Sequence, residues 1–297
     1  MKFNILRNPA VRRAIYSVLE RYRARDSISI ATLSDDYISK ELLSSGWYER
    51  PFLRLLKKLI KSNLSQKGIK SYVVDIGANI GNHSLYFSSQ VDHVISVEPN
   101  PICVNLLKAS IEVNAINNII VIPKGAGLKA ETLCLNFDES HTGGGSFLDI
   151  KEGILPRSID VEIETLDSIV NENVDNNSKI KLIKIDAEGF EVNVIKGAQK
   201  TLMTHSPMIA FEAHGLDNYN NISQSLKDEG YQSFYRLIQA RRIYKSFILN
   251  ALNMFFRPSL LKIEKIQNPD DTNYQMVIAI KDKSCSSLDY LNGYFNG

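Results

Sequence analysis

Three short segments carry residues whose types and spacing could bind a nucleoside and handle a proton. The first is the glycine bend, residues 75–81, with the sequence Asp-Ile-Gly-Ala-Asn-Ile-Gly. The second is Val97-Glu98-Pro99, and the third is residues 184–191, Lys-Ile-Asp-Ala-Glu-Gly-Phe-Glu. Each follows a short apolar run, so we expect all three at the carboxyl ends of parallel strands, where open α/β sheets bind their ligands.

The glycine bend lies where a predicted strand turns into a predicted helix. Glycines there let the backbone approach a ligand closely, and the start of a helix offers free N–H groups. Glu98 closes the next predicted strand, where a carboxylate can accept hydrogen bonds from both hydroxyls of a ribose. The residues expected to bind a nucleoside cofactor are Asp75, Gly77, Ala78, Asn79, Gly81, Glu98 and Pro99.

The glycine spacing distinguishes between two nucleoside cofactors. A dinucleotide fingerprint has the pattern G-x-G-x-x-G, in which two close glycines make room for a pyrophosphate. This chain instead has Gly77-x-x-x-Gly81, and Asp75 precedes the first glycine. An acidic side chain there repels a pyrophosphate but can hold an amino group, directly or through water. The pattern favours S-adenosylmethionine over NAD, and a nicotinamide-dependent oxidoreductase is the alternative.

The order of the predicted elements indicates how these segments are positioned. From Tyr72 onward, short apolar runs alternate with helical segments, which predicts a doubly wound α/β sheet with parallel strands. Residues 132–137 and 159–164 alternate with period two and predict an inserted antiparallel β-hairpin, with residues 141–146 as a loop between its strands. Residues 1–69 show no strand-like alternation and predict an N-terminal helical cap, whereas residues 70–297 form the main domain.

Together these segments resemble the FkbM-type family of S-adenosylmethionine-dependent methyltransferases. The resemblance covers about residues 70–215 and rests on residues 75–81, Val97-Glu98-Pro99, Thr165-Leu166-Asp167, residues 184–191 and Lys196-Gly197-Ala198. It implies a class I methyltransferase fold, which is Rossmann-like, and S-adenosylmethionine as the cofactor. It also implies O-methylation of a hydroxyl, often on a sugar of a surface polysaccharide or on a polyketide-like metabolite. A non-catalytic relative that serves in a glycan assembly complex is a further alternative.

Methyl transfer to an alcohol needs a group that takes up the acceptor proton. The resemblance places Asp186 near the methyl group, so we expect Asp186 both to bind the cofactor and to take part in catalysis. Glu188 lies beside it, and His214 follows a later strand and titrates near neutrality. As an alternative, Asp186, Glu188, Glu212 and His214 gather a Mg²⁺ ion that lowers the pKa of the acceptor.

Composition limits the partners and the compartment. The chain has 297 residues, 44% hydrophobic and 23% charged, and a net charge of +2, which gives no reason to expect a nucleic acid as partner. Its three cysteines form no C-x-x-C pair, as in proteins of a reducing compartment, so we expect a cytoplasmic location.

Residues 236–265 mix basic and apolar side chains and predict a basic helical insertion. Such a helix either packs on its own sheet or makes a peripheral contact with an anionic membrane, which would suit a lipid-linked glycan acceptor. Residues 1–69 and 236–297 carry no motif of the family, so we expect them to select the acceptor. The oligomeric state has no signal in the sequence.

Overall fold

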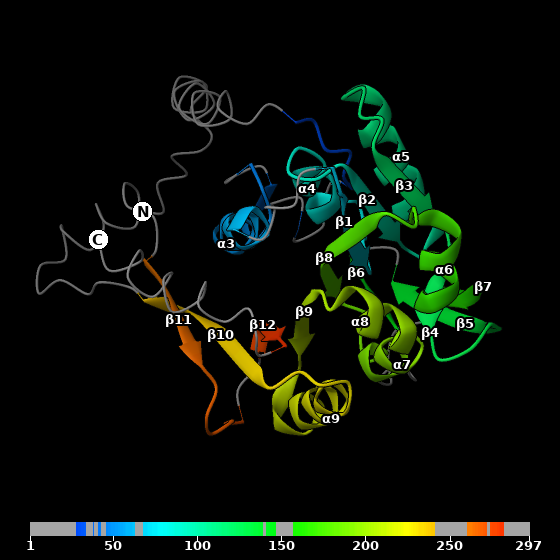
Figure 1. Cartoon of the computed structure of the whole chain (residues 1–297). Helices are drawn as coiled ribbons and strands as arrows, with labels where there is room; N and C mark the ends of the chain where they lie inside the picture. Colours follow the sequence, from blue (N-terminus) through cyan, green and yellow to red (C-terminus); the bar gives the residue numbers. More distant parts are fainter. Residues whose placement is uncertain are drawn as a thin grey trace, which may run out of the picture.

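The computed structural model describes residues 28–33, 38, 41–42, 46–62, 68–138, 141–146, 157–240, 260–271 and 274–281. Within these ranges the strands form a large 8-stranded sheet and a small 4-stranded sheet. Helices lie on both faces of the large sheet (Figure 1). This is the layered arrangement that the alternating strand and helix patterns predict.

The helices are α3 (Arg50–Ser62), α4 (Asn82–Ser88), α5 (Pro101–Val113), α6 (Leu166–Asn173), α7 (Glu191–Lys196), α8 (Gln199–His205) and α9 (Gly215–Asp228). The strands of the large sheet are β1 (Lys70–Ile76), β2 (His93–Val97), β3 (Ile119–Ile122), β8 (Ser178–Ile185), β9 (Met208–Ala213), β10 (Ser233–Ala240), β11 (Leu260–Lys265) and β12 (Tyr274–Ile280). Those of the small sheet are β4 (Gly125–Gly127), β5 (Glu131–Asp138), β6 (His141–Ser146) and β7 (Arg157–Thr165).

The large sheet has the strand order β11-β10-β12-β9-β8-β1-β2-β3. Strands β3, β2, β1, β8 and β9 are parallel neighbours, whereas β12 runs antiparallel to both β9 and β10. This order, with the antiparallel strand β12 inserted between β9 and β10, is that of the class I methyltransferase fold. The predicted fold class is therefore confirmed.

Side chains alternate between two hydrophobic clusters, one on each face of the large sheet. Val73 of β1 packs on one face with Leu56 of α3 and Leu85 of α4. Its neighbour Val74 packs on the opposite face with Leu202 of α8. Since both faces are covered, β1 is apolar over most of its length rather than alternating with polar residues.

Helix α3 is part of the predicted cap, and it belongs to the core of the sheet domain. Its apolar residues Leu53, Leu56 and Ile60 are fully buried, and Pro51 stands in its first turn, where the missing N–H costs nothing. The division of the chain into a cap of residues 1–69 and a main domain stays a prediction.

The small sheet confirms the predicted antiparallel pair and corrects the predicted loop. Strand β5 pairs with β7 in antiparallel register from Glu131↔Ile163 to Phe137↔Arg157. Residues 141–146, predicted as a loop, form strand β6, which pairs with β5. The prediction failed because ladder hydrogen bonds use backbone groups, which glycines carry like other residues, whereas the loop was inferred from side-chain types.

The predicted helical insertion at residues 236–265 is wrong at both of its ends. Residues 236–240 belong to β10 and residues 260–265 to β11, and the two strands pair antiparallel at the edge of the sheet. Arg236 and Glu264 are partners in this ladder, and the Arg236 Nε lies 3.1 Å from the Glu264 Oε2. The charged residues at these ends therefore form a cross-strand pair. Residues 241–259 lie outside the described residues, so a helix there stays a prediction.

Two motif residues of the family bind the first turns of helices. The Thr165 hydroxyl accepts a hydrogen bond from the Ser168 N–H at 3.2 Å and caps α6. The Asp167 carboxylate accepts hydrogen bonds from the N–H groups of Thr201 at 2.8 Å and Lys200 at 3.0 Å, at the start of α8. These residues of the motif therefore stabilise helix ends, away from the ligand-binding edge of the sheet.

We expect Asp167→Ala to lower the free energy of unfolding by about 1 kcal/mol, because two N–H groups in the first turn of α8 lose their acceptor. Urea unfolding measures this loss. The matched control is Asp160→Ala, which changes an exposed side chain of β7 and should shift the free energy by less than about 0.5 kcal/mol. Equal effects of the two substitutions would contradict the capping role.

Candidate active site

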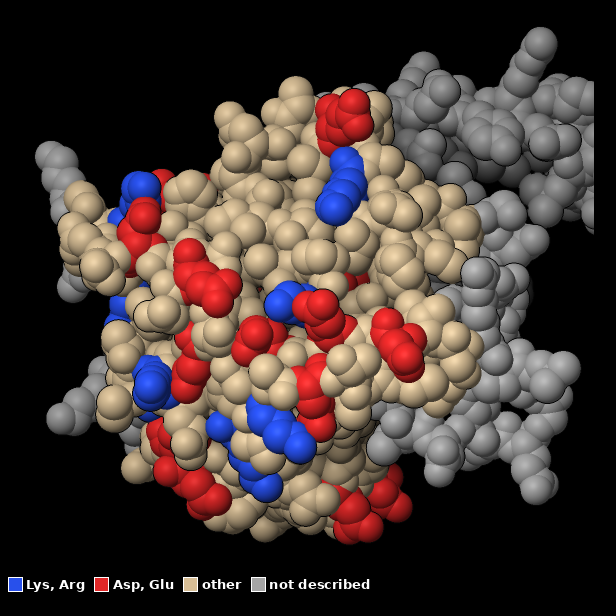
Figure 2. Space-filling view, turned by 90° about the vertical axis from the view of Figure 1, so that its right-hand side faces the viewer, with Lys and Arg blue, Asp and Glu red and all other residues tan. Residues whose placement is uncertain are grey.

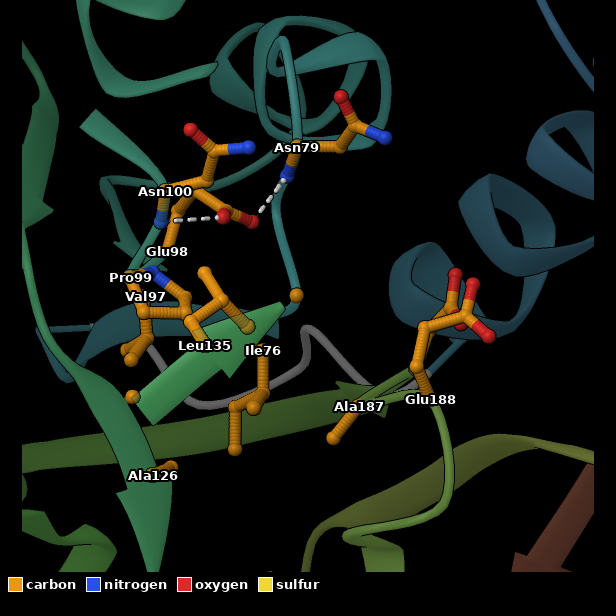
Figure 3. A pocket seen from close by; sticks show the side chains of 13 residues that line it. Ile76, Asn79, Val97, Glu98, Pro99, Asn100, Ala126, Leu135, Ala187 and Glu188 are labelled. Carbon is orange, nitrogen blue, oxygen red and sulfur yellow. Dashed lines mark hydrogen bonds between the residues drawn. The ribbon is translucent and has the colours of Figure 1, made fainter. Parts of the chain in front are cut away.

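A pocket opens at the carboxyl ends of β1, β2 and β8 (Figure 3). The small sheet closes one side of it with Leu135 of β5 and Ala126 of β4. The lining residues are Ile76, Gly77, Asn79, Val97, Glu98, Pro99, Asn100, Gly125, Ala126, Leu135, Asp186, Ala187 and Glu188. All three segments singled out in the sequence thus contribute to one pocket, with an apolar middle and a carboxylate at each end.

Glu98 forms one end of the pocket and is held by backbone N–H groups. Its Oε2 accepts a hydrogen bond from the Asn79 N–H and its Oε1 one from the Asn100 N–H, both at 2.8 Å (Figure 3). Burial raises the pKa of Glu98 to about 7, although these two hydrogen bonds favour the charged form. Each carboxylate oxygen has a second lone pair, so Glu98 can still accept hydrogen bonds from two hydroxyls of a ligand.

The glycine bend brings β1 and β8 into direct contact. Gly77 has a φ of 69°, and a Cβ placed on it would lie 1.7 Å from the carbonyl oxygen of Asp186. The N–H groups of Gly77 and Ala78 donate to the Val97 carbonyl oxygen at 3.0 and 3.1 Å. These two N–H groups therefore join the bend to β2. Of these two residues, which were both expected to bind the cofactor, Gly77 lines the pocket and Ala78 does not.

Asp75 and Gly81, two further residues expected to bind the cofactor, do not line the pocket. The carboxylate of Asp75 is fully buried: its Oδ2 accepts a hydrogen bond from the Ser84 hydroxyl at 2.6 Å, and its Oδ1 lies 3.4 Å from the Lys184 Nζ. Gly81 has a φ of 90°, and a Cβ there would lie 2.2 Å from the Leu107 side chain. Gly81 thus lets α5 pack against the bend.

The sequence analysis assigned no role to Lys184, the first residue of the third segment. Its side chain is 2% exposed and contacts the glycine bend. Its Nζ donates to the Gly77 carbonyl oxygen at 3.0 Å and lies 3.1 Å from the Asp186 Oδ2. Burial alone would lower the pKa of Lys184, but Asp186 and Asp75 together raise it above its ordinary value. A lysine between two isoleucines near the end of a buried strand was the signal available in the sequence.

Asp186 and Glu188 stand at the acidic end of the pocket, and Figure 3 shows Glu188 far from Glu98. Glu188 has a φ of 49°, an uncommon conformation for a non-glycine residue, and the buried Glu191 accepts hydrogen bonds from the N–H groups of Ala187 and Gly189 in the same turn. Burial, with the charges of Asp186 and Glu191, raises the pKa of Glu188 to about 7.

Glu212, near the end of β9, and His214, which follows that strand, lie beside this acidic end. Burial raises the pKa of Glu212 to about 8, and the charges of Asp186, Glu49 and Glu188 add to the effect. The His214 side chain is 54% exposed, its Nε2 lies 3.8 Å from the Glu212 Oε1, and it does not line the pocket. The charges of Asp186, Glu188 and Glu212 therefore act on one another, although Glu212, like His214, does not line the pocket.

Tyr48 and Glu49, which precede α3, approach the same carboxylates and were missed in the sequence. Burial raises the pKa of the Tyr48 hydroxyl, with the charges of Glu49, Glu212 and Asp186 as further causes. The Asn82 side chain fixes the Tyr48 backbone, since its Oδ1 accepts from the N–H at 3.0 Å and its Nδ2 donates to the carbonyl at 3.1 Å. No local pattern marks Tyr48, because its position depends on this long-range contact.

Across the described part of the chain, no group of three or more His, Cys, Asp or Glu residues is arranged to hold a metal ion. The magnesium alternative therefore has no ligand set. Likewise, the described helices include none that is both long and apolar enough to cross a membrane.

The sheet order and the pocket beyond β1, β2 and β8 define a class I methyltransferase. The family described as "Methyltransferase FkbM domain" matches residues 75–233, more than half of the 297 residues, and the chain belongs to this family. The resemblance inferred from the motifs is thereby confirmed. Family and fold together imply S-adenosylmethionine as the cofactor.

Similar proteins are found among both sequences and solved structures. Methyltransferase sdnD of Sordaria araneosa is 26% identical over 157 residues, which span 43% of this chain and 61% of that protein. Methyltransferase 1 of Beauveria bassiana is 23% identical over 205 residues, which span 61% of this chain and 76% of that protein. The structure of Methyltransferase FkbM from Methylobacillus flagellatus superposes with a TM-score of 0.41 and 18% identity, covering 78% of this chain and 56% of that one.

We expect Glu98→Gln to weaken binding of S-adenosylhomocysteine by at least tenfold, about 1.4 kcal/mol. An amide offers one acceptor oxygen instead of two, and its NH₂ group would face a backbone N–H donor. Titration calorimetry measures the affinity. Glu112→Gln, on the exposed side of α5, is the matched control. Unchanged affinity in Glu98→Gln would remove Glu98 from the cofactor site.

We expect Gly77→Ala and Gly68→Ala to differ sharply, although both residues have positive φ. Gly68 has nothing within 4 Å of an added Cβ, so only the backbone cost of about 1–2 kcal/mol applies. Gly77→Ala also forces the methyl group into the Asp186 carbonyl, at a further cost of ~3 kcal/mol or more. Urea unfolding compares them, and similar stabilities would contradict the close contact of β1 and β8.

Proposed function

We propose that this protein transfers a methyl group from S-adenosylmethionine to a hydroxyl of a polyhydroxylated acceptor, a sugar or another small metabolite. The observation that carries the proposal is the pair formed by Glu188, which lines the pocket, and Glu212, which interacts with it electrostatically: their pKa values are raised to about 7 and 8. A general base works best when its pKa lies near the working pH, so these carboxylates are suited to take a proton from an alcohol.

The residues of the pocket fit the cofactor at both ends. When bound, S-adenosylmethionine supplies a methyl group carried on a positively charged sulfur. Glu98 is the residue for the ribose hydroxyls, and the apolar side chains of Ile76, Val97 and Leu135 suit the adenine. Asp186 is the residue for the amino group, the role that sequence analysis gave to Asp75, because Asp75 is buried against Lys184 and Ser84.

On the acceptor side, we assign the general base to Glu188. Of the three candidates, Glu188 lines the pocket, His214 does not, and Asp186 is assigned to the amino group of the cofactor. Glu188 accepts the proton of the acceptor hydroxyl, and a pKa of about 7 leaves a large ionised fraction at neutral pH. Asp186 beside it carries the charge that helps to raise this pKa.

The negative charges at the acidic end of the pocket favour one class of acceptor over others. Asp186, Glu188, Glu212 and Glu49 accept hydrogen bonds from hydroxyls and repel anionic groups. This favours an uncharged polyol over a phosphorylated or carboxylated acceptor. Acidic and basic side chains are intermixed on the face shown in Figure 2, which supports an acceptor other than a nucleic acid. A lipid-linked glycan, a membrane contact through residues 236–265 and a cytoplasmic location remain predictions.

The experiment that tests the proposal is turnover against a panel of free sugars, polyols, amines and sugar phosphates. Release of S-adenosylhomocysteine is measured, and the methylated atom is located by NMR. We expect product from uncharged hydroxyl compounds and none from sugar phosphates. Cofactor binding without turnover on any member would favour the non-catalytic alternative, and binding of NADH in place of S-adenosylmethionine would favour an oxidoreductase.

At saturating cofactor, which removes the contribution of Glu98 to binding, we expect kcat to rise with pH through about 7. Glu188 is protonated and inactive below its pKa of about 7 and ionised above it. Glu188→Gln should lower kcat by about 10²–10⁴-fold and abolish this pH dependence. The control Glu172→Gln, on the exposed face of α6, should keep it. An unchanged profile in Glu188→Gln would exclude Glu188 as the base.

A further inference from the structure

The ammonium group of Lys184 is buried between the ends of β1 and β8. Its Cα is the ladder partner of Asp75, and its side chain is 2% exposed. The Nζ contacts the Gly77 carbonyl oxygen at 3.0 Å, the Asp75 Oδ1 at 3.4 Å and the Asp186 Oδ2 at 3.1 Å. One buried charge thus joins the glycine bend to a carboxylate of the pocket.

We infer that Lys184 is a positioning residue, which holds the Asp186 carboxylate toward the pocket so that it binds the amino group of the cofactor. This inference rests on the proposed function, in which Asp186 takes that amino group. It assigns Lys184 no contact with the reacting atoms. Its effect on binding is exerted through Asp186 and through the Gly77 carbonyl.

The pairing of β1 with β8 does not by itself account for a charge at this position. Strands β1 and β8 are already joined along seven paired positions, and the Asp186 N–H also donates to the Ile76 carbonyl oxygen at 3.1 Å. An apolar side chain at position 184 would avoid the desolvation of an ammonium group. The charge is therefore best explained by what it does to the two carboxylates that it contacts.

The charges around Lys184 leave one negative charge facing the pocket. Asp75 is fully buried and hydrogen-bonded by Ser84, so its charge and that of Lys184 compensate each other inside the protein. Asp186, whose side chain is 29% exposed, carries the remaining charge, and its Oδ2 lies 3.1 Å from the Lys184 Nζ. A partly exposed carboxylate that lines the pocket complements a single ammonium group of a ligand.

The test removes the buried pair together, because Lys184→Met alone would leave Asp75 with an unpaired buried charge and could unfold the chain. In the double variant Asp75→Asn/Lys184→Met no such charge remains, and Asn can still accept the hydrogen bond from Ser84. Lys179→Met, on the same strand and away from the pocket, is the matched control. Thermal unfolding confirms that each variant is folded before any ligand is added.

Two ligands separate positioning from general damage to the pocket. S-adenosylhomocysteine carries the amino group, whereas 5′-methylthioadenosine has the same nucleoside without it. We expect the double variant to bind S-adenosylhomocysteine about tenfold more weakly and 5′-methylthioadenosine within twofold of the unmodified chain. Calorimetry measures both affinities, and the control should change neither.

Equal losses for the two ligands would show that Lys184 only maintains the shape of the pocket, and no loss for either would show that Asp186 needs no anchor. Both results overturn the inference and leave the proposed function standing. If the unmodified chain binds neither ligand, the proposed function fails, and the inference fails with it.

Discussion

The site depends on the contact between the backbone of Gly77 and the carbonyl of Asp186, which is too close for any side chain between them. This contact fixes the ends of β1 and β8 relative to each other. Glu98 and the apolar part of the pocket then lie on the side of β2, and Asp186 and Glu188 lie on the side of β9. Lys184 supports the contact from within, since its ammonium group binds the carbonyl of the same glycine.

The two ends of the pocket hold carboxylates in different ways. Glu98 accepts N–H groups from Asn79 and Asn100, so its geometry follows from the backbone of the bend and of the loop after β2. At the other end Asp186 is held by an ammonium group, and Glu188 sits on a left-handed turn. The pocket therefore lies between Glu98 at one end and Asp186 and Glu188 at the other. This arrangement suits a ligand that is polar or charged at both ends.

The sequence predicted the elements well because parallel strands buried on both faces are apolar runs, and the glycine bend follows the first of them. It could not show which way Asp75 and Lys184 point, since the two become partners only through the register of β1 and β8. The position of Tyr48 could not be predicted for a similar reason, because it depends on hydrogen bonds between its backbone and the side chain of Asn82 in α4. Side-chain types also misled at β6 and at the ends of β10 and β11, where backbone pairing decides the structure.

Strand β12 lies between β9 and β10 although it comes last of the three in the chain. During synthesis, β9 and β10 are therefore complete before the strand that separates them has left the ribosome. Until Tyr274–Ile280 emerges, β9 presents an open edge, and such an edge can pair with another chain. The final sheet order therefore requires β12 to insert between two strands that precede it in the chain.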